Sequence, residues 1–284
     1  MGRMKSPRAG SAPSHETVSS YLHLLKKTLL RFPLDEEDRA LRAHIAGVDA
    51  AQLREIDRWM DQARDPGADC PDVEVRAAGR DWPTTAETMI GLFRMDNLHA
   101  TLLDVIQRGV PGDAIEVGAW RGGAAIFMRA IVKMCGEAAR QVWVADSFQG
   151  LPRPDAARYP ADAGDTHWQH PELAVSLDDV RANFQRYGLL DRQVTFLPGW
   201  FRDTLPQAPI GELALLRIDG DMYESTMVAL ESLYPKLRSG GFAIIDDYGA
   251  LESCRRAVDD YRRREAIRDA LLPIDWTGVM WQRS

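Results

Sequence analysis

The 284-residue chain has few cysteines, no long apolar run and no excess of basic residues. Its three cysteines, Cys70, Cys135 and Cys254, stand far apart, and no CxxC pair exists. We therefore expect neither a disulfide framework nor a zinc site, and we expect a reducing, cytoplasmic location. No apolar run reaches the roughly 18 residues of a membrane-spanning helix. Residues 1–20 also lack the apolar centre of a secretory signal, so we expect no membrane partner.

Acidic residues outnumber basic ones. The chain holds 42 Asp and Glu against 35 Lys and Arg, which gives a formal net charge of −7. Proteins whose main partner is a nucleic acid usually present a basic face, so we expect no nucleic-acid partner. Hydrophobic residues at 45% and charged residues at 27% are ordinary for a globular protein. A chain of this length can form one large α/β domain or two small ones.

Short apolar runs alternate with segments of helical periodicity in the second half of the chain. We predict strands at residues 113–118, 141–145, 194–197, 213–218 and 242–245, and helices at residues 122–134, 177–187, 226–237 and 254–270. A final antiparallel strand or hairpin is predicted at residues 274–281. Strands that alternate with helices indicate a doubly wound, mostly parallel α/β sheet.

The first part of the chain is polar and helical in pattern. We predict a disordered tail at residues 1–16, an amphipathic helix at 17–30, a charged helical insert at 35–72, a loop at 65–83 and a helix at 86–109. The last of these helices is expected to flank the ligand crevice. The chain is thus divided into a helical region, residues 17–110, and a core, residues 111–284.

Within that core, residues 147–175 form a long polar segment rich in proline and histidine. Ordered loops of this length are uncommon unless they are functional. We therefore predict that this segment is a lid over the substrate.

Two predicted strands end abruptly in carboxylates. Leu215–Ile218 is followed by Asp219, and Phe242–Ile245 by Asp246 and Asp247. Ligands of open α/β sheets bind beyond the carboxyl ends of the strands, so we expect the three carboxylates to face one crevice. Such carboxylates repel one another, and Mg²⁺, which prefers oxygen ligands, would remove that repulsion. The alternative is that they are ordinary turn residues at strand ends.

The first predicted strand leads into a glycine-rich turn, Asp113-Ala-Ile-Glu-Val-Gly-Ala-Trp-Arg-Gly-Gly. Its spacing is neither GxGxxG nor the GxxxxGK[ST] of phosphate loops. Glu116 suits a cationic ligand better than a pyrophosphate, and Asp146 at the next strand end can accept two ribose hydroxyls. The combination resembles the S-adenosylmethionine site of class I methyltransferases. In the alternative interpretation, Glu116 pairs with Arg121 and Asp146 caps a turn.

Longer stretches of sequence resemble one enzyme family. They include Asp81-Trp-Pro, Thr88-Met-Ile-Gly, Asp146-Ser-Phe-Gln-Gly-Leu-Pro, Leu216-Arg-Ile-Asp-Gly-Asp-Met-Tyr-Glu-Ser-Thr, Asp246-Asp-Tyr-Gly and Asp275-Trp-Thr-Gly. With these stretches the chain resembles the metal-dependent O-methyltransferases of antibiotic sugars, of the macrocin (TylF) type. The similarity covers about residues 80–284 and the first helix.

This resemblance implies a seven-stranded, Rossmann-like methyltransferase sheet with an antiparallel C-terminal strand and added N-terminal helices. It implies transfer of a methyl group from S-adenosylmethionine to a sugar hydroxyl of a glycosylated natural product, with Mg²⁺ holding that hydroxyl. It also hints at a homodimer or higher homo-oligomer. By the same resemblance, the metal ligands are Asp219, Asp246 and Asp247. The residues at the cofactor are Thr88, Met89, Glu116, Gly118, Gly122, Asp146, Ser147 and Trp200.

The resemblance places Asp221 where the family has its proposed general base. Asp221 lies two residues after Asp219, so it could face the same hydroxyl without binding the metal. A carboxylate near such a hydroxyl can accept its proton. The alternative is that Asp221 caps the following helix. His167 and His170 in the predicted lid are a second pair of base candidates.

Three rival functions remain open from the sequence alone. The acceptor could be a catechol or another small phenol, because the residues that shape its pocket are not defined by the motifs. An NAD-dependent sugar oxidoreductase would fit the sheet and the ribose carboxylate, but the chain lacks GxGxxG. A non-catalytic protein on the same fold would be expected to have lost part of the acidic set, which is intact.

Overall fold

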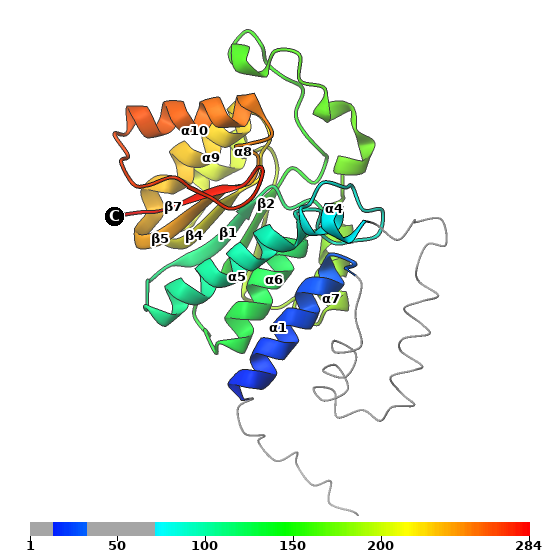
Figure 1. Ribbon diagram of the computed structural model, residues 1–284. Coiled ribbons are helices and arrows are strands. Elements are labelled where there is room, and N and C mark those ends of the chain that lie inside the picture. The colour runs from blue at the N-terminus through cyan, green and yellow to red at the C-terminus, as the bar shows by residue number, and fades with distance from the viewer. Residues whose placement is uncertain (1–13, 33–71) are drawn as a thin grey trace, which may run out of the picture.

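A computed structural model describes residues 14–32 and 72–284 of the chain (Figure 1). Most of the tail predicted at residues 1–16 and of the charged insert predicted at residues 35–72 lies outside the described residues. All helices and strands named below lie within residues 14–32 and 72–284.

A seven-stranded sheet forms the centre of this part of the chain, with the strand order β3-β2-β1-β4-β5-β7-β6. The strands are β1 Asp113–Val117, β2 Val142–Asp146, β3 Val194–Pro198, β4 Leu213–Ile218, β5 Leu237–Ile245, β6 Leu272–Pro273 and β7 Val279–Gln282. The pairings from β3 to β5 are parallel, and β7 runs antiparallel to both β5 and β6. The predicted doubly wound, mostly parallel sheet with an antiparallel C-terminal strand is therefore confirmed.

Helices cover both faces of the sheet (Figure 1). One face carries α1 His15–Leu29, α5 Gly91–Gln107, α6 Gly123–Met134 and α7 Leu177–Arg186, whose apolar residues share one core. The other face carries α8 Phe201–Thr204, α9 Tyr223–Leu233 and α10 Glu252–Arg264 over a second core. The strands are buried on both sides, which explains why their sequences are continuous apolar runs and not alternating patterns.

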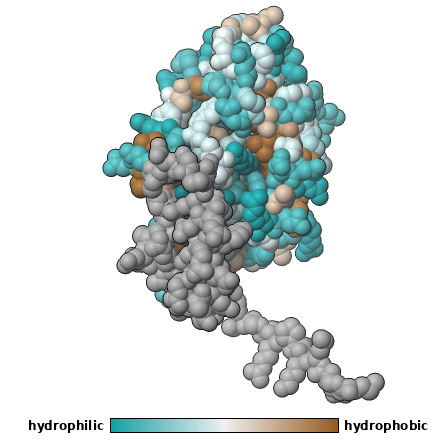
Figure 2. All heavy atoms as spheres, turned by 90° about the vertical axis from the view of Figure 1, so that its right-hand side faces the viewer, coloured by the Kyte–Doolittle hydropathy of each residue, from teal (hydrophilic) through white to brown (hydrophobic). Residues whose placement is uncertain are grey.

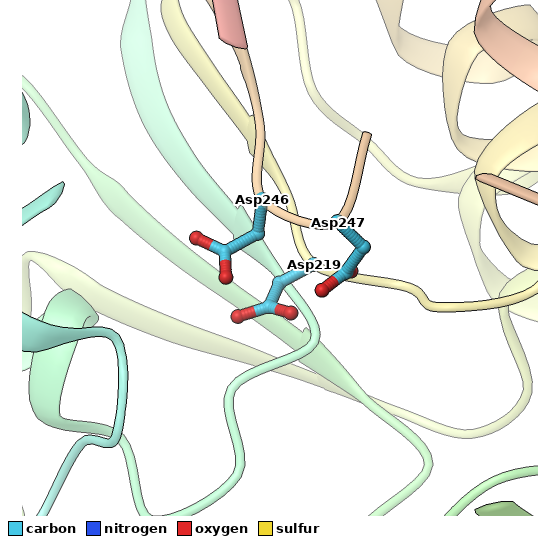
Figure 3. A group of neighbouring side chains, drawn as sticks. All are labelled: Asp219, Asp246 and Asp247. Carbon is cyan, nitrogen blue, oxygen red and sulfur yellow. The ribbon is translucent and has the colours of Figure 1, made fainter. Parts of the chain in front are cut away.

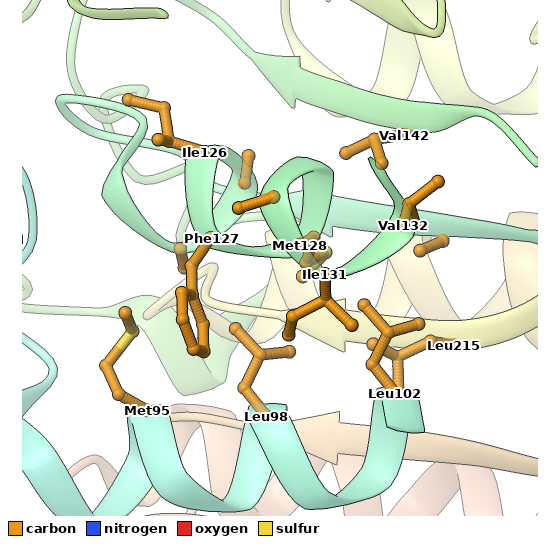
Figure 4. Close-up of a cluster of buried hydrophobic side chains, with 14 of the residues drawn as sticks. Met95, Leu98, Leu102, Ile126, Phe127, Met128, Ile131, Val132, Val142 and Leu215 are labelled. Atoms are coloured by element: carbon orange, nitrogen blue, oxygen red, sulfur yellow. The ribbon is translucent and has the colours of Figure 1, made fainter. Parts of the chain in front are cut away.

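The first core is built from helical positions at intervals of three and four. Met95, Leu98 and Leu102 of α5 face Phe127 and Ile131 of α6 (Figure 4), and all five side chains are fully buried. Burying a large apolar side chain contributes roughly 1.5–3 kcal/mol. This packing fixes α5 and α6 against the sheet, and with them the turn between β1 and α6.

Several predicted boundaries were wrong, each for a local reason. The helix predicted at 86–109 begins only at Gly91, because the backbone of Glu87 is hydrogen-bonded to Leu29 and Gly123 instead of within a helix. The helix predicted at 226–237 ends at Leu233, since Pro235 lacks an amide donor. The helix predicted at 254–270 ends at Arg264, shortly before a residue with a left-handed backbone.

Two other boundaries also differ from the prediction. The first helix begins at His15, within the predicted tail, after Ser14 caps it by accepting from the amide of Thr17. The predicted loop at residues 65–83 contains the short helix α4, Val73–Ala77, which Asp72 caps. Asp and Ser are preferred caps because their side chains accept from free amides of the first turn.

The segment between β2 and α7, predicted as a lid, extends away from the sheet (green in Figure 1) and contains three short 3₁₀ helices. Both carboxylate oxygens of Asp162 accept backbone amides of α9: Oδ1 from Tyr223 at 2.6 Å and Oδ2 from Glu224 at 3.0 Å. The segment is thus tied to the start of α9, next to the carboxyl end of β4.

The surface visible in Figure 2 is mainly hydrophilic, with small separate hydrophobic areas. None of the helices in the described part of the chain has the length and apolar character needed to cross a membrane.

Candidate active site

Three carboxylates gather at the ends of β4 and β5. Because Ile218 pairs with Ile245 in register, the residues that follow, Asp219 and Asp246, emerge side by side. One oxygen each of Asp219, Asp246 and Asp247 lies within 4.8 Å of the others (Figure 3). The structure therefore brings together the three residues that the sequence suggested as metal ligands, in a geometry that one cation could bridge.

Two buried arginines contact this acidic group. Arg217 of β4 donates to Glu116, to Asp246 and, at 3.1 Å, to Asp219. Arg94 of α5 also donates to Asp246. The side chains of both arginines are less than a tenth exposed, so these ion pairs lie largely out of water. Both oxygens of Asp246 are held by guanidinium groups, which fixes the orientation of that carboxylate.

Arg94 and Arg217 do not fully offset the negative charges of the carboxylates in this acidic group. Burial, with the nearby charge of Asp246, raises the pKa of Asp219 to about 6. Burial, with the charge of Asp219, raises the pKa of Asp221 to about 7. Burial and Asp221 also raise the pKa of Asp247 well above its ordinary value. A divalent cation would relieve this repulsion, so the donor set fits Mg²⁺.

Asp221 lies beside the three carboxylates and has a left-handed backbone with φ of 57°. Its amide donates to Asp247 Oδ2 at 3.3 Å, and its carbonyl accepts from Ser253. His167, in the segment predicted as a lid, pairs with Asp165 at 2.9 Å, and its charge acts on Asp221. Although burial lowers the pKa of His167, its hydrogen bond to Asp165 and the nearby charges of Asp165 and Asp221 raise it overall.

The two lid histidines do not occupy equivalent positions. His167 lines the cavity at the acidic group. His170 is turned toward Glu172, with its Nδ1 3.2 Å from Oε1, and lies edge-on to Trp82. Of the two base candidates in the lid, the geometry supports His167 and places His170 elsewhere.

The turn between β1 and α6 approaches the acidic group closely. Gly118 has φ of 93°, and a Cβ on it would lie 1.8 Å from the carbonyl oxygen of Asp219. Glycine is therefore required for the turn to pass the end of β4. Gly122, with φ of 86°, caps the start of α6 and is not among the residues that line the cavity.

Glu116 and Asp146 lie on either side of this turn. Glu116 Oε1 accepts from Arg217, while its Oε2 is buried and finds no hydrogen-bond partner among the described residues. Burial, opposed by Arg217, raises the pKa of Glu116 to about 8. The alternative pairing of Glu116 with Arg121 was wrong: Arg121 donates to the carbonyls of Pro83 and Ala86. The unpartnered oxygen fits a cationic or amide-bearing cofactor.

Asp146, at the end of β2, accepts hydrogen bonds from the turn between β1 and α6. Its Oδ2 accepts from the amides of Ala119 at 2.7 Å and Trp120 at 3.3 Å, and its Oδ1 from Phe148 at 2.7 Å. Burial raises the pKa of Asp146 although these amides oppose the rise. The predicted turn cap is thus present, and Oδ1, which accepts a single amide, keeps a further lone pair for a ligand.

A cavity of about 340 Å³ connects the region of Glu116 and Asp146 with the acidic group at the ends of β4 and β5. Its wall contains every predicted cofactor, metal and base residue except Gly122 and His170, that is Thr88, Met89, Glu116, Gly118, Asp146, Ser147, His167, Trp200, Asp219, Asp221, Asp246 and Asp247. Two half-exposed tryptophans, Trp82 and Trp276, also line it. One cavity therefore extends from the turn after β1 to the acidic group.

The comparison with known proteins decides the family. The family model for macrocin-O-methyltransferase (TylF) matches residues 18–283. The chain belongs to the macrocin O-methyltransferase family. It is accordingly an O-methyltransferase, and the alternative of an NAD-dependent oxidoreductase is set aside.

Curated relatives cover most of this methyltransferase. A tetracenomycin-C 4'-O-methyltransferase of Streptomyces olivaceus is 56% identical over 215 residues, which are 75% of this chain and 82% of that protein. The mycinamicin III 3''-O-methyltransferase of Micromonospora griseorubida is 46% identical and covers 94% of this chain and 97% of its own length. The solved structure of the O-methyltransferase NovP is 45% identical, with a TM-score of 0.80 over 94% of this chain and 99% of that one.

Some residues of this methyltransferase site escaped the sequence interpretation. Arg217 is a charged residue inside an otherwise apolar strand, and that position alone could have marked it. Arg94 stands four residues before the buried Leu98, on the apolar side of α5, which is a comparable signal. Trp82 and Trp276 fell within the recognised stretches, but nothing in their spacing assigned them to a cavity wall.

Proposed function

We propose that this enzyme transfers the methyl group of S-adenosylmethionine to a hydroxyl of a sugar in a glycosylated natural product, with Mg²⁺ at the three aspartates. The convergence of Asp219, Asp246 and Asp247 within 4.8 Å carries the proposal. Burial and the neighbouring carboxylates raise the pKa values of Asp219 and Asp247, and a divalent cation at this place would offset the repulsion between the carboxylates. The names of the relatives support a sugar acceptor, because they include enzymes acting in the tetracenomycin, novobiocin and mycinamicin series.

On the cofactor side, Glu116 and Asp146 are the principal binding residues in this proposal. The unpartnered Oε2 of Glu116 would accept from the cofactor's amino group, and Asp146 would use the remaining lone pair of its Oδ1 for a ribose hydroxyl. The other contacts would come from Thr88, Met89, Gly118, Ser147 and Trp200 in the cavity wall, with Gly122 shaping the turn. S-adenosylmethionine supplies a methyl group on a positively charged sulfur.

On the acceptor side, Asp219, Asp246 and Asp247 would hold the divalent cation. A cation at this position supplies the charge that makes a nearby hydroxyl easier to deprotonate. Arg94 and Arg217 orient Asp246 for this role. Asp221 then accepts the hydroxyl proton as the oxygen takes the methyl group, and the products are a methyl ether and S-adenosylhomocysteine. Fixing both reactants in line accounts for much of the rate increase.

The choice of Asp221 as base follows from its surroundings. Asp221 lies beside the three proposed metal ligands without being one of them, its amide donates to Asp247 Oδ2 at 3.3 Å, and a carboxylate at this place can accept the proton of the hydroxyl. His167 and Asp165 face it from the lid and would pass the proton toward solvent.

An acceptor screen tests the proposal. The enzyme is incubated with S-adenosylmethionine and, separately, an aromatic rhamnoside, a macrolide glycoside and catechol, with Mg²⁺ or with EDTA. We expect a methyl ether on the sugar of a glycoside, lost in EDTA and restored by Mg²⁺. Methylation of catechol alone would reject the sugar acceptor, and undiminished transfer in EDTA would reject the metal.

A further inference from the structure

Two tryptophans are exposed in the wall of the active-site cavity. Trp82 is 49% exposed and Trp276 is 42% exposed, and both line the cavity. Phe93 on α5 is exposed to a similar extent, at 50%, but lies outside the cavity wall. Large aromatic side chains left half in water inside a concave site are typical of ligand contact, since they supply much contact area at little entropic cost.

The position of Trp276 is fixed relative to the acidic group. The residue before it, Asp275, accepts from Arg94 at 3.1 Å, and Arg94 also binds the carboxylate of Asp246. The residue after it, Thr277, donates its hydroxyl to the carbonyl of Asp246 at 2.9 Å. Both neighbours of Trp276 are therefore tied to Asp246, directly or through one arginine.

The indole ring of Trp276 also makes contacts of its own that fix its position. Its Nε1 donates to the carbonyl of Ala78 at 2.7 Å, and the guanidinium of Arg80 lies 5.0 Å from the ring centre. With its polar atom already bonded, the ring can offer a ligand only its apolar surface.

Trp82 stands where the segment before Thr88 meets the lid. The neighbouring Asp81 forms an ion pair with Arg76 at 2.5 Å, which anchors this segment to α4. The ring of Trp82 lies edge-on to His170 of the lid, with 5.4 Å between ring centres. A ligand that fills the mouth of the cavity would therefore meet Trp82 and the lid together.

The order of the strands shows which ligand Trp276 would meet. The cofactor candidates Glu116 and Asp146 end β1 and β2, and the acidic group ends β4 and β5. Trp276 directly precedes β7, on the other side of β5. The acidic group thus lies between the cofactor residues and Trp276, so an acceptor whose hydroxyl lies at the acidic group extends toward Trp276.

We propose that Trp82 and Trp276 determine acceptor specificity by packing against a flat apolar ring face that adjoins the methylated hydroxyl. The inference rests on the proposed function and narrows its substrate class. Such a face has two possible sources, the C–H face of the pyranose ring or the ring system of the aglycone. Aromatic side chains favour both, because they pair large flat surfaces without requiring polar partners.

The test compares Trp276→Ala and Trp82→Ala with the matched control Phe93→Ala. Steady-state kinetics are measured with a full aromatic glycoside and with the simple methyl glycoside of the same sugar. The affinity for S-adenosylmethionine is measured in parallel by calorimetry. Trp276→Leu, which keeps an apolar side chain but lacks a flat ring, serves if an alanine variant loses thermal stability.

We expect the KM for the full glycoside to rise about tenfold or more in each tryptophan variant, with cofactor affinity unchanged and Phe93→Ala like wild type. An equal rise with both acceptors identifies the pyranose face, and a rise with the full glycoside alone identifies the aglycone. An unchanged KM in the tryptophan variants would overturn the inference. A loss of affinity for S-adenosylmethionine as large as the rise in KM would also overturn it.

This design separates the inference from the proposed function. The acceptor screen on wild-type enzyme decides whether a sugar is methylated. The variants are compared on whichever acceptor the wild-type enzyme methylates, so the role of the two tryptophans is decided in either case.

Discussion

Arg217 and Glu116 are register partners on the neighbouring strands β4 and β1, and their side chains form an ion pair inside the sheet. Only 1% of the arginine side chain and 2% of the glutamate side chain are exposed. The same guanidinium also donates hydrogen bonds to Asp246 and Asp219. One buried cation therefore connects the cofactor half of the site with the metal half.

Removing that cation tests its contribution to stability. Arg217→Met would leave Glu116 and Asp246 buried without a principal partner, and breaking a buried ion pair in this way costs about 3–5 kcal/mol. Denaturant titration should show this loss in the free energy of unfolding. The control is Arg263→Met, because Arg263 pairs with Asp260 on an exposed helix face and should contribute less than about 1 kcal/mol. Equal losses in the two variants would contradict a special role for Arg217.

The raised pKa values of the aspartates predict a pH dependence of the metal-free protein. The pKa of Asp219 is about 6 and that of Asp221 about 7 in the folded protein, against an ordinary value of 3.8. The folded state therefore binds more protons than the unfolded state between these values, and stability falls as the pH rises from about 4 through about 7. Mg²⁺ should raise the melting temperature strongly at pH 8 and little at pH 5.

Thermal melts in EDTA and in Mg²⁺ across this pH range check that prediction. Asp221→Asn removes one of the titrating groups, so its melting temperature in EDTA should fall less steeply with pH than that of wild type. A variant with the same slope as wild type would show that other groups cause the pH dependence.

Asp221→Asn also tests the general base. Asn adopts left-handed backbone readily, so the substitution keeps the φ of 57° at this position. Loss of a general base reduces kcat by about 10²–10⁴-fold. Calorimetry should show unchanged binding of Mg²⁺ and S-adenosylmethionine. Normal turnover in Asp221→Asn, together with loss of activity in His167→Asn, would transfer the role to His167.

The contact between Asp162 and α9 predicts how the lid is held. Asp162→Ala removes both hydrogen bonds from the lid to the start of α9, and loss of a helix cap costs about 0.5–2 kcal/mol. Trypsin should then cleave the lid faster after Arg158, whose following residue is Tyr159. Ser14→Ala removes a comparable cap from α1, far from the lid in the sequence, and should leave the rate of lid cleavage unchanged. Similar cleavage in both variants would indicate that the contact does not restrain the lid.

The sheet and the acidic strand ends could be predicted because both depend on local patterns. A strand buried on both faces needs a continuous apolar run, and carboxylates that end such runs in a parallel sheet must meet at one edge. The positions of Asp219, Asp246 and Asp247 followed from these two facts. Helix boundaries were less predictable, because the amide and carbonyl of Glu87 are satisfied by residues distant in sequence.

The ion pairs within the site could not be predicted in the same way. The pairing of Glu116 with Arg217 depends on the register between β1 and β4, which no local pattern encodes, and the nearby Arg121 was the obvious but wrong partner. Arg94 and Asp246, whose side chains form a hydrogen bond, are 152 residues apart in the sequence. Contacts of this kind are fixed by how the elements pack, and only the structure reveals them.

The shared metal site is tested most simply by a calorimetric titration of Mg²⁺ into metal-free protein at pH 8, for wild type and for Asp247→Asn. If the three aspartates share one cation, wild type binds a single Mg²⁺ per chain and the variant binds it at least about tenfold more weakly. Absence of saturable binding in wild type, or equal affinity in the two proteins, would contradict a cation shared by Asp219, Asp246 and Asp247.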